Sequence, residues 1–232
     1  VCLLGSVNVL RHMVNGKLDT KLLSETVNIA VRFLDNIIDQ AAYPFPECEA
    51  SEKALRRMGI GTVGLADALI TAGLRYGSPE AVRFTSLVFL IIRDAAYNAS
   101  VMLAKEKGAF PQYTEEYNSR PFILGLSGET QLMLQKYGIR NAFLTSQAPT
   151  GTVAKLAGVW AGIEPYYART TIVSNRLGES RVVAPDSEYL VVAGELSPEQ
   201  HISMMVAAQA YIDSAVSKTV NAPRNQSVGN CH

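Results

Sequence analysis

Short apolar segments alternate along this chain with longer segments whose apolar residues recur at helical spacing. Residues 20–40 form the longest of the evenly spaced segments, and their apolar positions fall on one stripe of a helix: Leu23, Val27, Ala30, Val31, Leu34, Ile37 and Ile38. The segment before it, residues 1–10, is apolar with Gly5 and Ser6 inside, which favours a buried strand. Strands that alternate with amphipathic helices indicate an α/β fold.

Further elements are expected from periodicity and from helix start and stop residues. Ser78-Pro79-Glu80 has the N-cap, proline and acid of a helix start, and Gly108 is a suitable stop. A capping box at Ser197 begins a helix that should reach about residue 217. The remaining expectations are a strand at 57–61, helices at 63–72 and 129–137, a strand at 141–146 and extended chain at 166–183.

Composition excludes several classes of protein. The 232 residues are 48% apolar and 18% charged, which suits a large buried core. Net charge is zero with Lys and Arg scattered, so no basic surface for nucleic acid is expected, and no long uncharged apolar run predicts a membrane span. The three cysteines form no CxxC pair, which argues against a zinc or disulfide scaffold and favours a reducing cytoplasm. The initial valine and the polar tail suggest a piece of a longer polypeptide.

Residues 147–154 (QAPTGTVA) predict an anion site, because they follow an apolar strand and open a helix. The first turn of a helix has unpaired N–H groups and partial positive charge. Thr150 and Thr152 would add hydroxyl donors, and Gly151 would let a ligand approach the backbone. An ordinary capped helix start remains the alternative.

Other candidate motifs are weaker. Residues 59–64 spell GxGxxG, yet a polar segment precedes them, and the next acids, Asp67 and Glu80, are assigned to the interior and the first turn of helices, so close packing of a helix through small residues is favoured. Glu164 is either a functional carboxylate or a structural acid that pairs with a basic residue or with backbone N–H groups, and the structural role is favoured. His12 and His201 are expected in solvated segments. A lone buried cysteine such as Cys2 is, without context, a small hydrophobe.

Six segments, taken in order, resemble motifs of ribonucleotide reductase large chains. They are residues 2–9 (CLLGSVNV), 33–39 (FLDNIID), 57–69 (RMGIGTVGLADAL), 140–142 (RNA) with 148–152 (APTGT), 162–165 (GIEP) and 217–221 (SKTVN). The sequences APTGT and SKTVN are most similar to those of the adenosylcobalamin-dependent class. Some cobalamin-independent chains share part of these motifs.

The resemblance implies a fold and a domain. It implies the later part of a ten-stranded α/β barrel with long surrounding helices, formed by residues 1–223, with a tail at 224–232 that does not match. In the family a thiyl radical removes the ribose 3′ hydrogen, the 2′ hydroxyl leaves as water, and two cysteines become a disulfide.

The resemblance also implies site residues and partners. Cys2 matches the second cysteine of the reducing pair. The substrate, a ribonucleoside di- or triphosphate, would be held through its phosphates by a loop made of Ala148, Pro149, Thr150, Gly151, Thr152 and Val153. A thioredoxin-like dithiol would restore the thiols, adenosylcobalamin would serve the complete enzyme, and a homodimer is compatible with the family.

Departures from the family pattern leave alternatives open. The loop with the radical cysteine lies upstream of residue 1 in the family, so the chain alone is expected to be inactive. Leu3 replaces the asparagine of the first motif. A non-catalytic remnant of the same barrel and a nicotinamide dehydrogenase built on residues 59–64 are the competing hypotheses.

Overall fold

The computed structural model describes residues 3–175 and 178–222, and it gives no side-chain description for residues 173–180. Cys2 and the predicted tail at 224–232 therefore lie outside the described residues. The helices are α1 Thr20–Gln40, α2 Pro46–Leu55, α3 Leu65–Thr71, α4 Pro79–Lys107, α5 Pro121–Leu124, α6 Gly128–Tyr137, α7 Gly151–Ala157 and α8 Pro198–Gln209, with short 3-10 turns at Val9–His12, Glu115–Ser119 and Ala193–Glu195. The strands are β1 Leu3–Asn8, β2 Met13–Val14, β3 Lys17–Leu18, β4 Met58–Val63, β5 Thr170–Asn175 and β6 Gly178–Val183.

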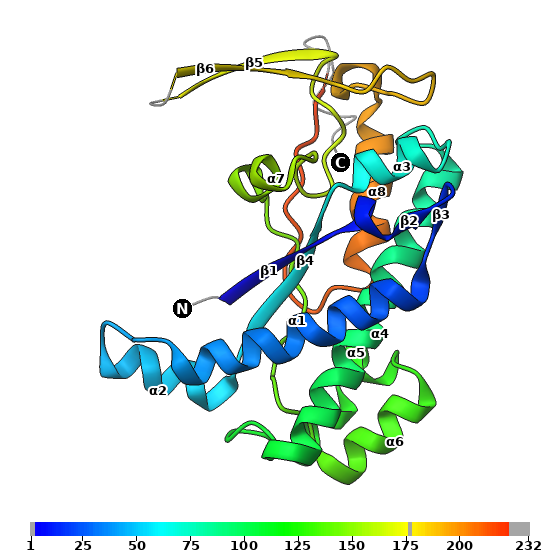
Figure 1. Ribbon diagram of the computed structural model, residues 1–232. Coiled ribbons are helices and arrows are strands. Elements are labelled where there is room, and N and C mark those ends of the chain that lie inside the picture. The colour runs from blue at the N-terminus through cyan, green and yellow to red at the C-terminus, as the bar shows by residue number, and fades with distance from the viewer. Residues whose placement is uncertain (1–2, 176–177, 223–232) are drawn as a thin grey trace.

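Strands β1 and β4 are parallel and run side by side across the centre of the molecule (Figure 1), with Leu3 opposite Met58 and Asn8 opposite Val63. Helices α1 and α2 make the connection between them, as parallel pairing requires. Every residue of β4 is buried, which explains its continuous apolar sequence.

Two further extended segments continue this array beyond β4. Ile60 N donates to Leu144 O over 2.8 Å and Ser146 N to Ile60 O over 3.1 Å, so residues 143–146 lie parallel to β4. Gln147 then pairs with the segment around Val216. The predicted strand at 141–146 is thus an extended segment joined to β4 by an isolated bridge. Among the described residues the array is open, and no closed barrel is seen.

Helices α1 and α4 pack on each other and enclose the main core with β1 and β4. The predicted bounds of α1 are confirmed, and Asp19 caps its first turn by accepting from Leu22 N at 2.9 Å. The predicted α4 is also confirmed, from the Ser78 cap to the stop at Gly108, whose φ is +85°. By length and composition α4 could span a membrane, but 61% of its apolar window is buried inside the protein.

One expectation about the helices is corrected by the structure. The last helix, α8, ends at Gln209 rather than near residue 217, because the chain turns there and pairs with Gln147 as an extended segment. The polar residues before the glycine motif belong to helix α2, which ends at Leu55, and the C-cap residue Arg56 has a φ of +51°.

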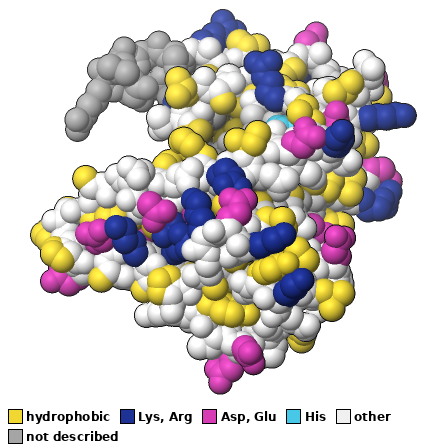
Figure 2. All heavy atoms as spheres, turned by 60° about the horizontal axis from the view of Figure 1, so that its bottom comes forward, with side chains coloured by type: hydrophobic (Ala, Val, Ile, Leu, Met, Phe, Trp, Pro, Cys, Tyr) yellow, Lys and Arg dark blue, Asp and Glu magenta, His cyan; other side chains and the backbone are white. Residues whose placement is uncertain are grey.

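A cluster of charged side chains joins the helices to the end of α2, and we call it the Asp35 cluster. Asp35, with no exposed side-chain surface, accepts from the Arg56 guanidinium at 2.8 Å and from Asn141 Nδ2 at 3.1 Å. Arg56 also reaches Asp39 at 2.7 Å, and Arg140 and Lys107 approach Asp35 at the rim. On the outer face of the molecule basic and acidic side chains are interspersed (Figure 2).

Candidate functional site

The predicted anion site lies where the chain leaves the parallel array and turns into α7. Gln147 begins this turn, and its buried side chain holds the turn to β4. Its Oε1 accepts from Thr62 N at 2.8 Å and from the Thr62 hydroxyl at 2.9 Å, while its Nε2 donates to Thr62 O and Ala148 O. All the hydrogen-bonding positions of this amide group are therefore used to hold the backbone before the loop.

Thr150 gives the loop its shape. Its φ is +56°, a left-handed conformation that is unfavourable for a residue with a branched side chain. Its hydroxyl donates to Pro149 O and accepts from Gly162 N, both at 2.8 Å. The expectation that this hydroxyl serves as a ligand donor is thus not supported, since it is already engaged within the loop.

The backbone after Thr150 has the properties expected of an anion site. The first hydrogen bond of α7 runs from Ala154 N to Thr150 O, so the helix does not use the N–H groups of Gly151, Thr152 and Val153. These three residues are exposed, and a Cβ added at Gly151 would meet nothing within 4 Å. Three donors at the positive end of the helix therefore face open space.

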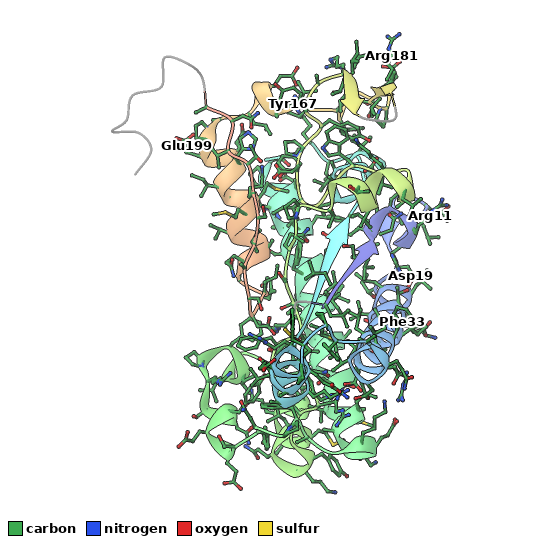
Figure 3. All side chains as sticks on the ribbon, turned by 90° about the vertical axis from the view of Figure 1, so that its left-hand side faces the viewer. Arg11, Asp19, Phe33, Tyr167, Arg181 and Glu199 are labelled. Atoms are coloured by element: carbon green, nitrogen blue, oxygen red, sulfur yellow. The ribbon has the colours of Figure 1, made fainter. Side chains whose placement is uncertain are left out.

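A cleft of about 560 Å³ runs from Gly151 along α7 and beneath the hairpin of β5 and β6. Two cations, Lys155 and Arg181, line it together with the aromatic side chains of Trp160 and Tyr166. Figure 3 shows Arg181 on the hairpin, at the end of the molecule opposite α6. The cleft gives the Thr150 loop a positively charged neighbourhood, which favours an anionic ligand.

The cysteine of the predicted site cannot be located, because Cys2 lies outside the described residues. Strand β1 is described from Leu3, which pairs with Met58 at the start of β4. The predicted approach of Cys2 to the Thr150 loop remains a prediction.

The GxGxxG segment is no dinucleotide site. Gly59 and Gly61 lie inside β4, and only Gly64, with a φ of +73°, lies at a helix start. A Cβ on Gly61 would collide with the carbonyl of Ser146. The small residues thus allow a neighbouring extended segment to approach the strand, whereas the sequence suggested close packing of a helix. A nicotinamide dehydrogenase is not supported.

Glu164 is a structural acid, as expected. Its Oε2 accepts from Lys218 Nζ and its Oε1 from Thr219 N, each at 2.7 Å. The Lys218 side chain has no exposed surface, and its Nζ also lies 3.0 Å from His201 Nδ1.

The expectation that both histidines are solvated is wrong. His201 is fully buried and its Nε2 lies 3.2 Å from Ala193 O, while His12 is 4% exposed and contacts Asn8 O and Thr26. Burial lowers the pKa of His201, and the nearby Lys218 ammonium lowers it further. The partners Thr26, Ala193 and Lys218 lie in neighbouring elements of the chain, 8 to 17 positions away, so the periodicity within one helix did not indicate these contacts.

Two residues of this region, Asp67 and Lys218, were not identified from the sequence as parts of the site, and the hydrogen bonds of Gln147 to Thr62 were not predicted. Asp67 accepts from Trp160 N at 2.8 Å and from the Tyr166 hydroxyl at 2.6 Å, which holds the segment after α7 to α3. Their partners are between 54 and 99 residues away in the chain, and no local pattern indicates such contacts.

Comparison with known proteins identifies relatives of this chain. The family model described as "Ribonucleotide reductase, barrel domain" matches residues 1–189. A vitamin B12-dependent ribonucleoside-diphosphate reductase of Mycobacterium tuberculosis is 36% identical over 98% of this chain, and its counterpart in Thermoplasma acidophilum is 31% identical over 95%. The ribonucleoside-diphosphate reductase subunit alpha of Chlamydia pneumoniae is 36% identical over 77%. The chain spans 36%, 32% and 19% of these three relatives, respectively.

Proposed function

The chain belongs to the ribonucleotide reductase barrel-domain family, and we propose that it forms part of an enzyme that reduces ribonucleotides to 2′-deoxyribonucleotides. The observation that carries the proposal is the Thr150 loop, whose three unused N–H groups face open space beside a cationic cleft. Such a loop suits the charged end of a nucleotide. Because it uses backbone donors, it holds every nucleotide in the same way whatever the base.

The substrate that we propose is a ribonucleoside diphosphate or triphosphate, and the names of the relatives favour the diphosphate. Its phosphates lie against the backbone of residues 148–153, with Gly151 at the centre of the loop. Lys155 and Arg181 add a favourable potential from the side of the cleft.

Cys2 is proposed as one of the two cysteines that supply the reducing equivalents. A thiyl radical elsewhere in the enzyme takes the 3′ hydrogen of the ribose and later returns it. The 2′ hydroxyl leaves as water, and the two thiols give up two electrons and two protons and form a disulfide. A thioredoxin-like dithiol then reduces that disulfide by thiol exchange. The net reaction converts a ribonucleotide and a dithiol into a deoxyribonucleotide, a disulfide and water.

The names of the vitamin B12-dependent relatives support adenosylcobalamin as the source of the radical in the complete enzyme. The cytoplasm is the proposed location, since free thiols persist in a reducing compartment. A homodimer stays a prediction from the family resemblance.

The proposed domain is a barrel that this chain completes only together with the rest of a reductase chain. The open array supports this, because β1 and the segment around Val216 form its two edges and remain available for further strands. We propose that residues 190–223, beyond the family match, belong to the same domain, since Gln147 pairs with Ala215 and Ser217. Residues 224–232 are proposed as a separate tail.

Two variants of the complete reductase test the proposal. Cys2→Ser should stop multiple turnover while ribonucleotide binding stays close to that of the unmodified enzyme, because serine cannot form a disulfide. Steady-state assays with a dithiol reductant and equilibrium binding measure the two properties. Unchanged turnover would remove Cys2 from the reaction.

Gly151→Ala tests the phosphate site. The added methyl group lies in open space, so folding should be unaffected, but it occupies the position proposed for the phosphates. We expect about tenfold weaker binding of a ribonucleoside diphosphate, the equivalent of about 1.4 kcal/mol. Gly128→Ala is the matched control, because Gly128 also starts a helix and its added Cβ would likewise meet nothing. Equal affinities for the two variants would contradict the proposed site.

A further inference from the structure

We propose that the Glu164–Lys218 ion pair positions the Thr150 loop for its phosphate, and that Glu164 and Lys218 are thus positioning residues for substrate binding. The inference rests on the proposed function of the loop. It assigns a role to the GIEP and SKTVN segments, which the proposed chemistry does not otherwise use.

The ion pair is buried and joins two segments that are distant in sequence. Lys218 has no exposed side-chain surface and Glu164 only 25%, and the distance from Nζ to Oε2 is 2.7 Å. The second carboxylate oxygen accepts from Thr219 N, so the carboxylate holds both the side chain and the backbone of the C-terminal segment. Charge-assisted hydrogen bonds of this kind are short and strong.

The surroundings of the Lys218 ammonium complete its coordination. His201 Nδ1, on α8, lies 3.0 Å away, and Thr219 O accepts a further hydrogen bond. The Tyr76 ring lies 6.0 Å from Nζ. Because His201 Nε2 lies within hydrogen-bonding distance of Ala193 O, the ring can donate there and accept from the ammonium with Nδ1.

Glu164 is connected to the Thr150 loop through a tight turn. Glu164 N donates to Ala161 O at 3.1 Å, and Gly162 lies inside this turn with a φ of +52°. Gly162 N donates to the Thr150 hydroxyl at 2.8 Å. A Cβ on Gly162 would lie 3.4 Å from the carbonyls of Ala148 and Pro149, so the turn packs directly on the backbone of the loop.

Lys218 is connected to the other end of the same loop. Gln147 N donates to Ala215 O at 3.0 Å, and Ser217 N donates to Gln147 O at 2.9 Å. The contacts form a closed ring, which passes from Gln147 to the C-terminal segment, across the ion pair to Glu164, and through Gly162 back to Thr150.

The ring explains how Thr150 keeps a backbone conformation that is unfavourable by itself. Unfavourable φ values persist only where the surrounding structure holds them, and binding sites gain from donors that are oriented before the ligand arrives. If the ion pair is broken, the turn at Gly162 is free to shift, and the N–H groups after Thr150 lose their common direction. The phosphates of the substrate should then bind less tightly, whereas contacts to the nucleoside should not change.

The test uses the complete reductase with Glu164→Gln and Lys218→Met. For each variant we expect about tenfold weaker binding of a ribonucleoside diphosphate in equilibrium binding, a ratio equivalent to about 1.4 kcal/mol. Binding of the unphosphorylated ribonucleoside should stay within about twofold. Glu164→Asp, which keeps the charge but shortens the reach, should lose less affinity and serves if the other variants fail to fold. The matched control is Glu106→Gln, which breaks an exposed ion pair between α4 and Arg32 of α1.

A second measurement separates positioning from a general loss of structure. Thr150→Val removes the hydroxyl that accepts the hydrogen bond from Gly162 N. Its effect on diphosphate affinity should therefore not add to that of Glu164→Gln. Additive effects, equal losses for nucleoside and diphosphate, or diphosphate affinity within twofold of the unmodified enzyme would each overturn the inference.

Gly151→Ala in the same assay distinguishes a failure of the positioning role from a failure of the proposed phosphate site. If Gly151→Ala weakens diphosphate binding and Glu164→Gln does not, the positioning role alone is wrong. If Gly151→Ala has no effect, the loop is not the phosphate site and both proposals fail.

Discussion

Two buried ion-pair regions in the described part of the chain differ in what surrounds them. In the Asp35 cluster, the Arg56 guanidinium and the Asp35 carboxylate are 4% and 0% exposed, and their hydrogen bonds go to each other, to the side chains of Asp39 and Asn141, and to the Asp35 carbonyl. The Glu164–Lys218 pair has similar chemistry, yet the loop that it supports has three N–H groups free toward solvent. Buried charge alone therefore does not indicate a site. We propose that the unused backbone donors beside the second pair mark the binding site.

The comparison also separates the motifs that resemble the reductase family. Asp35 comes from residues 33–39 and Asn141 from residues 140–142. Both meet Arg56 in the interior and hold α1, α2 and the array together. The APTGT, GIEP and SKTVN segments meet around Thr150. We attribute the first group of motifs to the stability of the fold. We attribute the second group to the proposed binding of phosphate.

The largest expected effect is on the Asp35 cluster. Asp35→Ala leaves the Arg56 guanidinium buried with Asp39 as its remaining acidic partner, and removal of one member of a buried ion pair costs about 3–5 kcal/mol. Denaturant unfolding should report a loss of this size, while the nucleotide affinity of the folded protein stays unchanged. A loss of affinity in proportion to the loss of stability would abolish the distinction between the two regions.

A smaller effect is expected at the glycines. Gly61→Ala places a methyl group against the Ser146 carbonyl and within 3.3 Å of Gln147 Cα, so it should destabilise the fold by about 1–3 kcal/mol through overpacking. Gly151→Ala should leave the free energy of unfolding nearly unchanged. Thermal unfolding of both variants checks the contrast, and equal shifts in Tm would contradict it.

The smallest effects are on the pH dependence of stability, which should separate the two regions. Burial and the Lys218 ammonium lower the pKa of His201, so protonation favours the unfolded chain and stability is lost as the pH falls below the ordinary value of 6.5. Hydrogen bonds from Arg56 lower the pKa of Asp39, so its contribution is present above 3.8 and is lost as the pH falls through its lower folded value.

Denaturant unfolding across this pH range measures both steps. His201→Gln should remove the loss that begins near pH 6.5, and Asp39→Asn should flatten the one below pH 3.8. Comparison of each variant with the unmodified chain separates the titration of His201 or Asp39 from that of the other ionisable groups. If His201→Gln leaves the first step in place, the buried histidine is not its source.

Much of the fold could be predicted because the signals are local. Helix α1 follows from an apolar stripe, and α4 follows from a serine cap and a glycine stop. The Thr150 loop was predicted from the free donors that every helix start has. The end of α8 was not predicted, since the segment after it is extended through pairing of Ala215 and Ser217 with Gln147, about seventy positions earlier in the chain.

The sequence by itself determined the α/β class, the caps, the membership of a family and the position of the turn that we propose binds an anion. Only the tertiary structure decided that His201 is buried, that Gly61 admits a neighbouring segment, and that Glu164 meets Lys218. The physical reason is the range of the forces involved. Periodicity and capping act within one or two turns of helix, whereas burial and ion pairing depend on residues that folding alone brings together.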